Sequence, residues 1–509
     1  MQEIIIDGSS LSLEAVAQVA IQKAPIRLAE QSISKVIKCR DYVERVIANG
    51  DIVYGLTTGF GKFSSVCIAK ENIAELQSNL IRSHAVSVGD PYSEEITRAI
   101  MLLRIAVLAK GHSGIRLETL QTLVEMLNKH VHPIIPMRGS VGASGDLSPL
   151  SHLALVLLGE GEALYMGQRM TGFEAMKKAN ISPVKLAAKE GLALNNGTQV
   201  MAAIGALCLI RSELMCKQAD ILAAMSIDAL LGTPQAMDPL VHKLRPHPGQ
   251  LYSAENIRKL IDNSPLRKSH LNCDNVQDAY SLRCSPQVHG AVRDALCYAR
   301  KVLEIEINSA TDNPLIFPDE DKVISGGNFH GEPLAIALDT MGIAISELAN
   351  ISERRMEQIL NPALSRGLPP FLAHRPGLDS GFMIIQLTAA SLVSENKVLS
   401  HPASVDNIPT SANQEDHVSM GSVSAIKLLQ IVENVNNVLA IELMIATQAI
   451  DIRDIPSSEA IESVRAKLRS LVPRLREDRV MYKEIQTAQC LIKQGDILSA
   501  VESMGIKID

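Results

Sequence analysis

The stretch from Gly421 to Ile450 constrains the fold most, because apolar residues occupy nearly all sides of the helix it would form. A helix at a protein surface keeps one polar side, so a helix that is apolar all round has to be buried among other helices. Apolar helical patterns also occupy most of residues 200–235 and 333–450. The chain is therefore predicted to build its core from long helices packed on one another.

The composition favours the same architecture. The 509 residues include eight Tyr, seven Phe and no Trp, so the core has to be built from aliphatic side chains. β-Sandwiches rely on aromatic and β-branched residues, whereas this composition favours helices packed on helices. We expect a mainly α fold with a long central helical bundle, an N-terminal head and minor β-hairpins. One such hairpin is predicted at residues 315–324, around a turn at 318–321.

Polar and glycine-rich loops divide the chain into three approximate segments of one functional unit. Residues 1–115 are predicted to form the head, residues 116–450 the central bundle and residues 451–509 a set of C-terminal helices. Ser12 is expected to cap the first long helix, because its hydroxyl can accept from the backbone N–H groups of the first turn. Ser148 is expected to cap a second helix, in which Pro149 would be the first residue.

Charge and cysteine usage exclude several classes of protein. The net charge is −7, so the basic surplus of a nucleic-acid binder is missing. The eight cysteines, Cys273 among them, form no CxxC pair, which is typical of reduced thiols in the cytosol. The N-terminus lacks the basic start of a signal peptide. The apolar part of the longest uncharged stretch, 191–210, is about 11 residues where a membrane span needs about 20. We expect a soluble cytoplasmic protein without a membrane partner.

The segment from Gly139 to Asp146 has the most unusual chemistry in the chain. It contains the triplet Ala143-Ser144-Gly145, whose side chains are small enough for the Gly145 nitrogen to reach the Ala143 carbonyl carbon. Closing that bond with loss of two waters, one of them from the Ser144 hydroxyl, gives a 4-methylidene-imidazole-5-one ring. The exocyclic methylene of this ring is a strong electrophile.

The common metal and phosphate motifs are absent. No HExxH occurs, and Glu415, Asp416 and His417 are adjacent, so on a helix they would point in different directions. The loop from Gly55 to Gly61 misses the spacing of a phosphate loop by one residue. The sequence predicts no metal and no external cofactor.

Seven motifs resemble, in the same order, blocks of the aromatic amino acid ammonia-lyases. The first is Val141-Gly-Ala-Ser-Gly-Asp-Leu-Ser-Pro-Leu150, which contains the ring-forming triplet. The other six are Tyr54-Gly-Leu-Thr-Thr-Gly-Phe-Gly61, Leu194-Asn-Asn-Gly-Thr-Gln199, Gln277-Asp-Ala-Tyr-Ser-Leu-Arg283, Thr311-Asp-Asn-Pro314, Gly327-Asn-Phe-His330 and Ser411-Ala-Asn-Gln-Glu-Asp-His417. The resemblance covers roughly residues 5 to 505. It implies autocatalytic ring formation from Ala143, Ser144 and Gly145, and a homotetramer whose active sites are shared among subunits.

The resemblance also implies roles for single residues. Tyr54 is expected to act as the base that removes the β-proton, and its phenol, with an ordinary pKa near 10, would have to be more acidic to do so at neutral pH. Arg283 is expected to bind the substrate carboxylate as a two-bond fork. The residues expected around the amine, the carboxylate and the ring are Asn196, Gln277, Tyr280 and Phe329. Tyr280 and Glu415 are also counted among the catalytic residues.

Two positions indicate the substrate. Ser83-His84 and Glu415 are similar to the histidine-specific members of the family. A histidine and a carboxylate can complement the two nitrogens of an imidazole, whereas a phenyl ring offers neither of them a partner. The implied reaction removes ammonia from L-histidine to give trans-urocanate, the first step of histidine degradation toward glutamate. Tyrosine or phenylalanine lyase activity, a 2,3-aminomutase and, more remotely, a non-catalytic helical scaffold are the alternatives.

Overall fold

The computed structural model describes residues 3–271 and 276–509, so the predicted free thiol of Cys273 lies outside the described residues. The chain forms two compact units, each built from three separate stretches. The first unit contains Met1–Ile210, Arg300–Asp339 and Pro402–Ile426. The second unit contains Arg211–Ala299, Thr340–His401 and Lys427–Asp509. The division into three segments at about residues 115 and 450 stays a prediction.

The first unit is mainly helical and carries all the strands of the described residues. Its helices are α1 (Leu13–Ala20), α2 (Glu30–Asn49), α3 (Ile73–His84), α4 (Glu94–Ala109), α5 (Leu117–Asn128), α6 (Leu147–Leu157), α7 (Gly172–Lys178) and α8 (Glu190–Asn195). Helix α4 is its centre, because every residue from Ile96 to Ala109 is buried. The short 3₁₀ helices are η1 (Gly61–Phe63), η2 (Lys70–Asn72) and η5 (Ser411–Asn413).

The strands pair in small sheets that tie loops together. The parallel pair is β1 (Ile4–Ile6) with β2 (Ile26–Leu28), and the three-stranded antiparallel sheet is β4 (Val131–Pro133), β6 (Glu162–Tyr165) and β7 (Gln168–Thr171). The two antiparallel pairs are β3 (Val88–Pro91) with β5 (Pro136–Arg138), and β8 (Leu315–Phe317) with β9 (Lys322–Ile324). The β8–β9 pair confirms the predicted hairpin.

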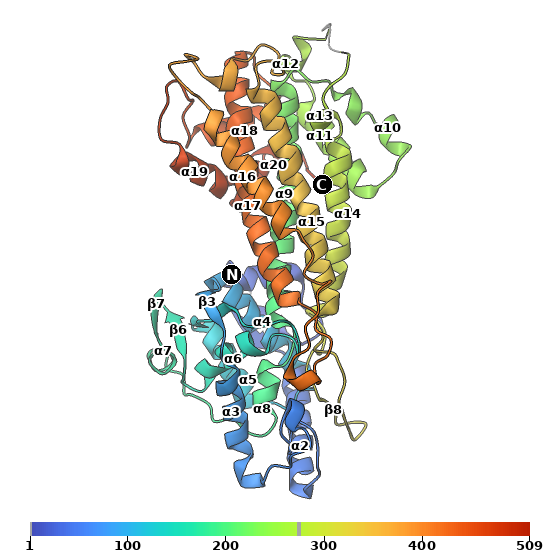
Figure 1. Ribbon diagram of the computed structural model, residues 1–509, viewed down its shortest axis with the longest axis vertical. Coiled ribbons are helices and arrows are strands. Elements are labelled where there is room, and N and C mark those ends of the chain that lie inside the picture. The colour runs from blue at the N-terminus through green and yellow to red at the C-terminus, as the bar shows by residue number, and fades with distance from the viewer. Residues whose placement is uncertain (1–2, 272–275) are drawn as a thin grey trace. The chain divides into compact units, whose positions relative to one another are not determined.

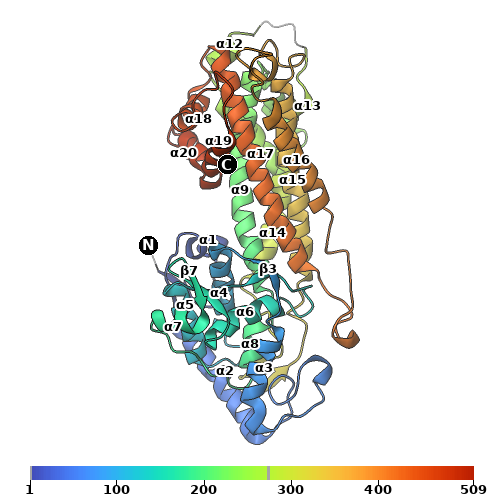
Figure 2. The same ribbon diagram turned by 60° about the vertical axis from the view of Figure 1, so that its left-hand side comes forward.

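The second unit is a bundle of long helices with shorter helices around it. It contains α14 (Ser285–Glu306) up to Ala299, α16 (Met383–Leu399), and the larger parts of α9 (Gln199–Ala229), α15 (Glu332–Leu360) and α17 (Gly421–Arg453). These helices run side by side in both views (Figures 1 and 2). The shorter elements are η3 (Pro234–Met237), α10 (Pro239–Lys243), α11 (Pro248–Ile261), α12 (Pro265–Lys268), α13 (Tyr280–Arg283), η4 (Pro370–Leu372), α18 (Glu459–Arg469), α19 (Tyr482–Gln494) and α20 (Asp496–Glu502). The predicted mainly α architecture is confirmed.

Three of the long helices correct one expectation from the sequence. By length and composition, α9, α15 and α17 are each sufficient to cross a membrane, so the prediction that no segment reaches that length was wrong. Between 67% and 78% of their apolar windows is buried inside the protein. Their apolar character is thus explained by helix packing in the bundle, as the pattern at 421–450 predicts.

The two predicted helix caps have different outcomes. The Ser12 hydroxyl accepts from the Ala15 N–H at 3.1 Å and caps α1 as expected. Helix α6, in contrast, begins at Leu147, so the prediction that Ser148 caps it was wrong. The Ser148 hydroxyl instead lies 2.7 Å from the Ser87 hydroxyl and joins α6 to the loop after α3. The helix therefore starts directly after the triplet region, closer to it than the sequence suggests.

Candidate active site

A cavity of about 1440 Å³ opens in the first unit, and the chain's unusual loops converge on it. Its lining residues come from the loop at 54–68, from α3, from the triplet region, from α8 and its end, and from the loops at 313–332 and 411–417. Seven residues predicted for the site line it: Tyr54, His84, Ala143, Ser144, Asn196, Phe329 and Glu415. The cavity is larger than the roughly 300–1000 Å³ that is usual for a small-molecule site.

The backbone around the triplet forms a tight turn. Gly142 and Gly145 pair as an antiparallel bridge, and the Ser140 hydroxyl donates to the Gly145 carbonyl at 3.0 Å. Gly145 has a φ of +74°, and a Cβ there would lie 2.1 Å from the Gly197 carbonyl oxygen. Only glycine fits this position, both for its backbone conformation and for the space around it. The turn holds the triplet compact, as closure between Ala143 and Gly145 requires.

Asn196 is the asparagine that contacts the triplet. Its side-chain amide donates to the Ser144 carbonyl oxygen at 3.1 Å, whereas the neighbouring Asn195 donates to the Ser151 hydroxyl. Arg104 supports this arrangement from α4, since its guanidinium donates to the Asn196 carbonyl at 2.7 Å. Burial lowers the pKa of Arg104 to about 10, although the charges of Asp312 and Asp146 oppose this shift. The sequence analysis missed Arg104, which lies among apolar residues in the buried part of α4.

Asp146 links the triplet region to the start of α9. Its carboxylate accepts from the Val200 and Met201 N–H groups at 2.9 and 3.1 Å and from the Ser422 hydroxyl at 3.0 Å. Burial raises the pKa of Asp146 to about 6, although these hydrogen bonds and the charge of Arg104 favour the ionised form. Its position one residue after the triplet was the signal that could have drawn attention to it.

Glu415 reaches the triplet from a loop far along the chain. The Ser144 hydroxyl donates to one of its carboxylate oxygens at 3.2 Å, and the Thr410 hydroxyl donates to the other at 2.6 Å. The backbones of Thr410 and Glu415 also pair, with Ala412 between them at a φ of +53°. This closed loop orients the Glu415 carboxylate, and Thr410 was not predicted as part of the site.

His84 lies at the C-terminal end of α3, on the wall that also carries Glu415. Its Nδ1 donates to the Leu80 carbonyl oxygen at 2.8 Å, so in the neutral ring Nε2 keeps an unprotonated lone pair. Burial lowers the pKa of His84, while the bond to Leu80 and the negative charge of Glu415 oppose the shift. His84 is therefore neutral at pH 7, with one nitrogen able to accept a hydrogen bond.

Tyr54 and Phe329 occupy further parts of the cavity lining, and both are half-buried. The Gly61 N–H approaches the Tyr54 phenol oxygen at 3.4 Å, across the same glycine-rich loop. This contact keeps the phenol oxygen next to the backbone of the glycine-rich loop.

Of the four remaining predicted residues, Gly145 lies in the turn described above, while Gln277, Tyr280 and Arg283 belong to the second unit and do not line this cavity. The Arg283 guanidinium lies over the Tyr280 ring, 4.4 Å from its centroid, and donates to the Asp278 carbonyl at 3.1 Å. The Tyr280 side chain is 71% exposed, and Gln277 is exposed too. The half-buried Arg283 and the exposed Tyr280 thus form a cation–π pair at the surface of the second unit.

Comparison with known proteins identifies the family. Residues 11–470 match the family described as aromatic amino acid lyase. The chain belongs to this family. The resemblance read from the seven motifs is thus confirmed over most of the chain.

Individual relatives extend the comparison over the full length. A histidine ammonia-lyase from Caldanaerobacter subterraneus subsp. tengcongensis is 52% identical, with 100% of both chains covered. A histidine ammonia-lyase from Alkaliphilus oremlandii is 54% identical over 99% of each chain.

Solved structures of enzymes with different names share this fold. Histidine ammonia-lyase from Trypanosoma cruzi has a TM-score of 0.92 and 44% identity, over 99% of this chain and 95% of that chain. Tyrosine aminomutase from Streptomyces globisporus has a TM-score of 0.94 and 38% identity, with 100% of both chains covered. The fold alone therefore does not distinguish the substrate. The side chains that line the site have to distinguish it.

Proposed function

We propose that this chain eliminates ammonia from L-histidine to give trans-urocanate, the first step of histidine degradation toward glutamate. The observation that carries the proposal is the pair His84 and Glu415, which line one cavity together with Ser144. Relatives named histidine ammonia-lyase at 50–54% identity over the whole chain support the same reaction.

The two side chains match an imidazole by their hydrogen-bonding capacity. The unprotonated Nε2 of His84 accepts a hydrogen bond, and the Glu415 carboxylate oxygens have lone pairs left beyond their bonds to Ser144 and Thr410. An imidazole has at least one N–H to donate, and the imidazolium has two. A phenyl ring would leave these half-buried acceptors without a partner, which is costly.

The prosthetic group of the proposal is the 4-methylidene-imidazole-5-one ring formed autocatalytically from Ala143, Ser144 and Gly145. The tight turn, the glycine at a φ of +74° and the Asn196 bond to the Ser144 carbonyl all fit this group. It supplies an electrophile that turns the substrate's amine into a good leaving group. No resident metal or external cofactor is required for this chemistry.

The chain's own residues have the following roles in the proposal. His84 and Glu415 hold the imidazole and thereby place the β-carbon toward the Tyr54 phenolate. Tyr54 takes the β-proton at its phenol oxygen, which the Gly61 N–H approaches. Asn196 keeps the Ser144 carbonyl in place, and Phe329 covers the side of the cavity. Gln277 and Tyr280 complete the network around the amine and carboxylate.

The carboxylate-binding residues enter this proposal from other copies of the chain. Arg283, Tyr280 and Gln277 do not line the cavity, and Tyr280 is 71% exposed. The cavity is also larger than one histidine requires. A homotetramer with shared active sites accounts for both observations, because a neighbouring subunit would fill the extra space and bring the Arg283 fork to the substrate carboxylate.

The proposed location and partners of the protein follow from its composition and from the burial of its apolar helices. We place the protein in the cytoplasm as a soluble enzyme whose partner is the small molecule L-histidine. Its net charge of −7 argues against a nucleic-acid partner, and its long apolar helices are buried inside the protein rather than offered to a membrane.

The test is incubation of the purified chain with L-histidine, L-tyrosine and L-phenylalanine in parallel. We expect urocanate absorbance and one released ammonia per turnover with histidine, at a kcat/KM at least about a hundredfold above that for the other two. A 2,3-aminomutase would instead yield the β-amino acid with the nitrogen retained, which mass spectrometry of the product detects. Greater turnover of tyrosine or phenylalanine than of histidine would contradict the proposal.

A further inference from the structure

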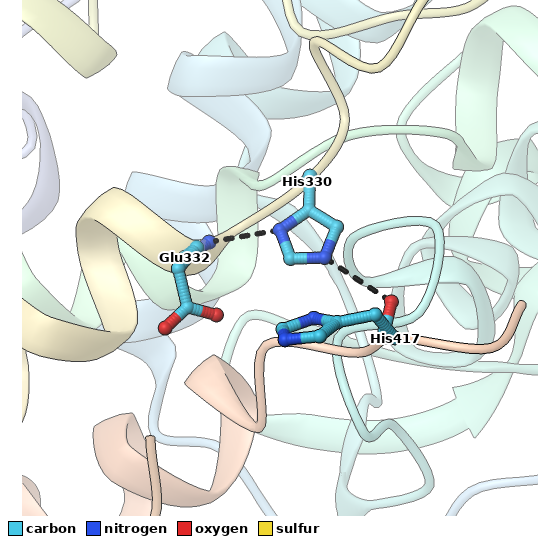
Figure 3. Close-up of side chains that lie close together, drawn as sticks. All are labelled: His330, Glu332 and His417. Carbon is cyan, nitrogen blue, oxygen red and sulfur yellow. Dashed lines mark hydrogen bonds between the residues drawn. The ribbon is translucent and has the colours of Figure 1, made fainter. Parts of the chain in front are cut away.

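Three potential metal ligands converge on the wall of the cavity, away from the triplet turn in sequence. His330 and Glu332 stand at the start of α15, and His417 comes from the loop that precedes α17 (Figure 3). One possible ligand atom from each residue lies within 4.8 Å of the other two. We call these three residues the His330 cluster, and none of them has a role in the reaction proposed above.

The hydrogen bonds of His330 leave one ring nitrogen suited to a metal. Its Nε2 donates to the His417 carbonyl oxygen at 3.2 Å, which leaves Nδ1 unprotonated. The Glu332 N–H approaches Nδ1 at 3.4 Å, a long contact that a metal ion could replace. Metal-binding histidines almost always donate their second N–H to a carbonyl or carboxylate, as His330 does here.

Glu332 provides an independent observation. Its Oε2 atom is buried and has no hydrogen-bond partner among the residues that the structure describes. A buried carboxylate oxygen without a partner is energetically costly, so such an atom usually has a ligand or an ion. In Figure 3 the carboxylate points to the side where the His417 ring lies.

The charges around the cluster favour a cation. The cavity lining contains three carboxylates, those of Glu332, Glu415 and Asp416, and its one lysine is Lys62. Bonds of about 2.0–2.2 Å to a shared ion would bring the three ligand atoms to within roughly 4 Å of one another. The exposed His417 side chain is free to make this small movement from the observed separation.

We propose that His330, Glu332 and His417 form a binding site for a divalent transition ion such as Zn²⁺ or Co²⁺. Two imidazoles and one carboxylate suit these borderline ions, whereas Mg²⁺ and Ca²⁺ prefer oxygen ligands. Three protein ligands leave a fourth position for water or for a group of the substrate. The site lies in the wall of the cavity, so a bound ion would face the same space as the proposed substrate.

The test measures binding directly, so its outcome does not depend on the proposed reaction. Untagged protein is stripped with a chelator, kept under a non-thiol reductant, and equilibrated with Co²⁺ or Zn²⁺ in the absence of L-histidine, which itself binds these metals. Dialysis with metal analysis gives the stoichiometry, and the visible spectrum of Co²⁺ reports its coordination. We expect about one ion per chain with nitrogen and oxygen ligands, and no comparable binding of Mg²⁺.

Matched variants assign the ion to the cluster. Glu332→Gln and His417→Gln each remove one ligand and should weaken Co²⁺ binding at least about tenfold. His374→Gln removes an exposed imidazole of the second unit and serves as the control, with unchanged binding. The ion should also raise the unfolding temperature of the wild type but not of the two ligand variants, and far-ultraviolet circular dichroism verifies that each variant is folded.

Several results would overturn the proposal. They are an absence of Co²⁺ and Zn²⁺ binding to the wild type, equal affinity in the wild type and both ligand variants, binding of Mg²⁺ as tight as that of Zn²⁺, or a purely thiolate spectrum from the exposed cysteines. If one ligand variant does not fold, the other decides the question by the same criterion.

Discussion

Two fully buried aspartates, one in each unit, differ in the sign of their pKa shift. Burial raises the pKa of Asp146 in the first unit to about 6, because the backbone N–H groups and the hydroxyl that bond to it lower the pKa too little to outweigh burial. Burial would also raise the pKa of Asp220 in the second unit, but the charge of Arg293 and the bonds from His289 and Asn256 outweigh it and lower the pKa to about 2.

The two aspartates illustrate two uses of buried polar groups. Some stabilise the fold, and others surround the site. Asp220 is neutralised by one fixed cationic partner, Arg293 at 2.7 Å, so it stabilises the bundle in one arrangement. Around the triplet, by contrast, buried atoms of Arg104, Asn196 and Gln199 have no hydrogen-bond partner among the described residues. Asp220 therefore has its partners inside the bundle, whereas the surroundings of the triplet keep polar capacity for the prosthetic group, for water and for the substrate.

The largest expected effect is on activity in the first unit. Ser144→Ala should fold normally and lose nearly all turnover, because only a residue that loses a β-hydroxyl can give the exocyclic methylene. Intact mass is the measurement: the wild type should be lighter than the encoded chain by two waters, and the variant should lack the methylene. A wild type with the encoded mass and full activity would refute the role of the triplet.

Substrate selection is the next largest effect. His84→Leu combined with Ser83→His, and separately Glu415→Gln, should each lower kcat/KM for L-histidine by roughly 10²–10⁴, because the imidazole nitrogens lose their partners. Intact mass should still report two lost waters, since Ala143, Ser144 and Gly145 are unchanged. The assignment to histidine fails if both variants keep near-wild-type kcat/KM, and only the family assignment then remains.

The corresponding change in the second unit should act on stability rather than on chemistry. Asp220→Asn leaves Arg293 and His289 buried beside an uncharged partner, so the free energy of unfolding should fall by about 3–5 kcal/mol. The urea unfolding midpoint measures this, and the mass of the folded fraction should keep its loss of two waters. An unchanged midpoint would show that the Asp220 network does not carry the stability assigned to it.

Arg283 tests the comparison of the two units directly, because it belongs to the second unit and is proposed to act in the site of the first. Arg283→Lys replaces a two-bond fork by a point charge and should cost about 2–4 kcal/mol in kcat/KM. If sites are shared between subunits, tetramers assembled from equal amounts of Ser144→Ala and Arg283→Lys chains should regain about a quarter of the wild-type sites by random mixing. No regain of activity would place Ser144 and Arg283 of each site in the same chain, and a loss below threefold for Arg283→Lys alone would remove it from the site.

The smallest expected effect is a pH dependence of opposite sign for the two aspartates. Asp146 binds its proton more tightly in the folded state, so its contribution to stability falls by about 3 kcal/mol as the pH rises from about 4 to 6. Asp220 binds its proton less tightly in the folded state, so its contribution of about 2–3 kcal/mol is present above pH 4 and is lost as the pH falls toward 2.

Unfolding midpoints across pH 2–7 for the wild type, Asp146→Asn and Asp220→Asn measure these contributions. The difference between the wild type and Asp146→Asn should change between pH 4 and 6, and the difference for Asp220→Asn should change below pH 4. Parallel curves for all three proteins would contradict the opposite shifts.

Local patterns predicted the elements well and their ends less well. The hairpin at β8–β9, the cap at Ser12 and the buried helix α17 depend on residues close in sequence, and all three are confirmed. The start of α6 was misplaced by two residues, because the Ser148 hydroxyl is engaged by Ser87, which lies 61 residues away in the chain. Contacts of this kind have no signal in a local pattern.

The candidate site was predictable where its chemistry resides in a motif. Short blocks predicted Ala143, Ser144, Tyr54, His84, Asn196 and Glu415, and all six line one cavity. Thr410, Arg104 and Asp146 were missed, because each acts through another residue that it holds in place. The His330 cluster was missed for a different reason. His417 is 87 residues from His330 in the chain, and the adjacent Glu415 and Asp416 do not join the cluster.

The sequence by itself determined that this chain is mainly helical, that its core is aliphatic, and that an Ala-Ser-Gly triplet of the lyase family stands in a glycine-rich turn. These properties are fixed by side-chain chemistry and by periodicity along the chain. Only the tertiary structure decided which lone pairs remain free. The Leu80 carbonyl sets the tautomer of His84, Thr410 orients Glu415, and the surroundings of Asp146 and Asp220 give one residue type two opposite pKa shifts. Hydrogen bonds and charge interactions act over a few ångströms in space, and the partners of both aspartates come from distant parts of the chain.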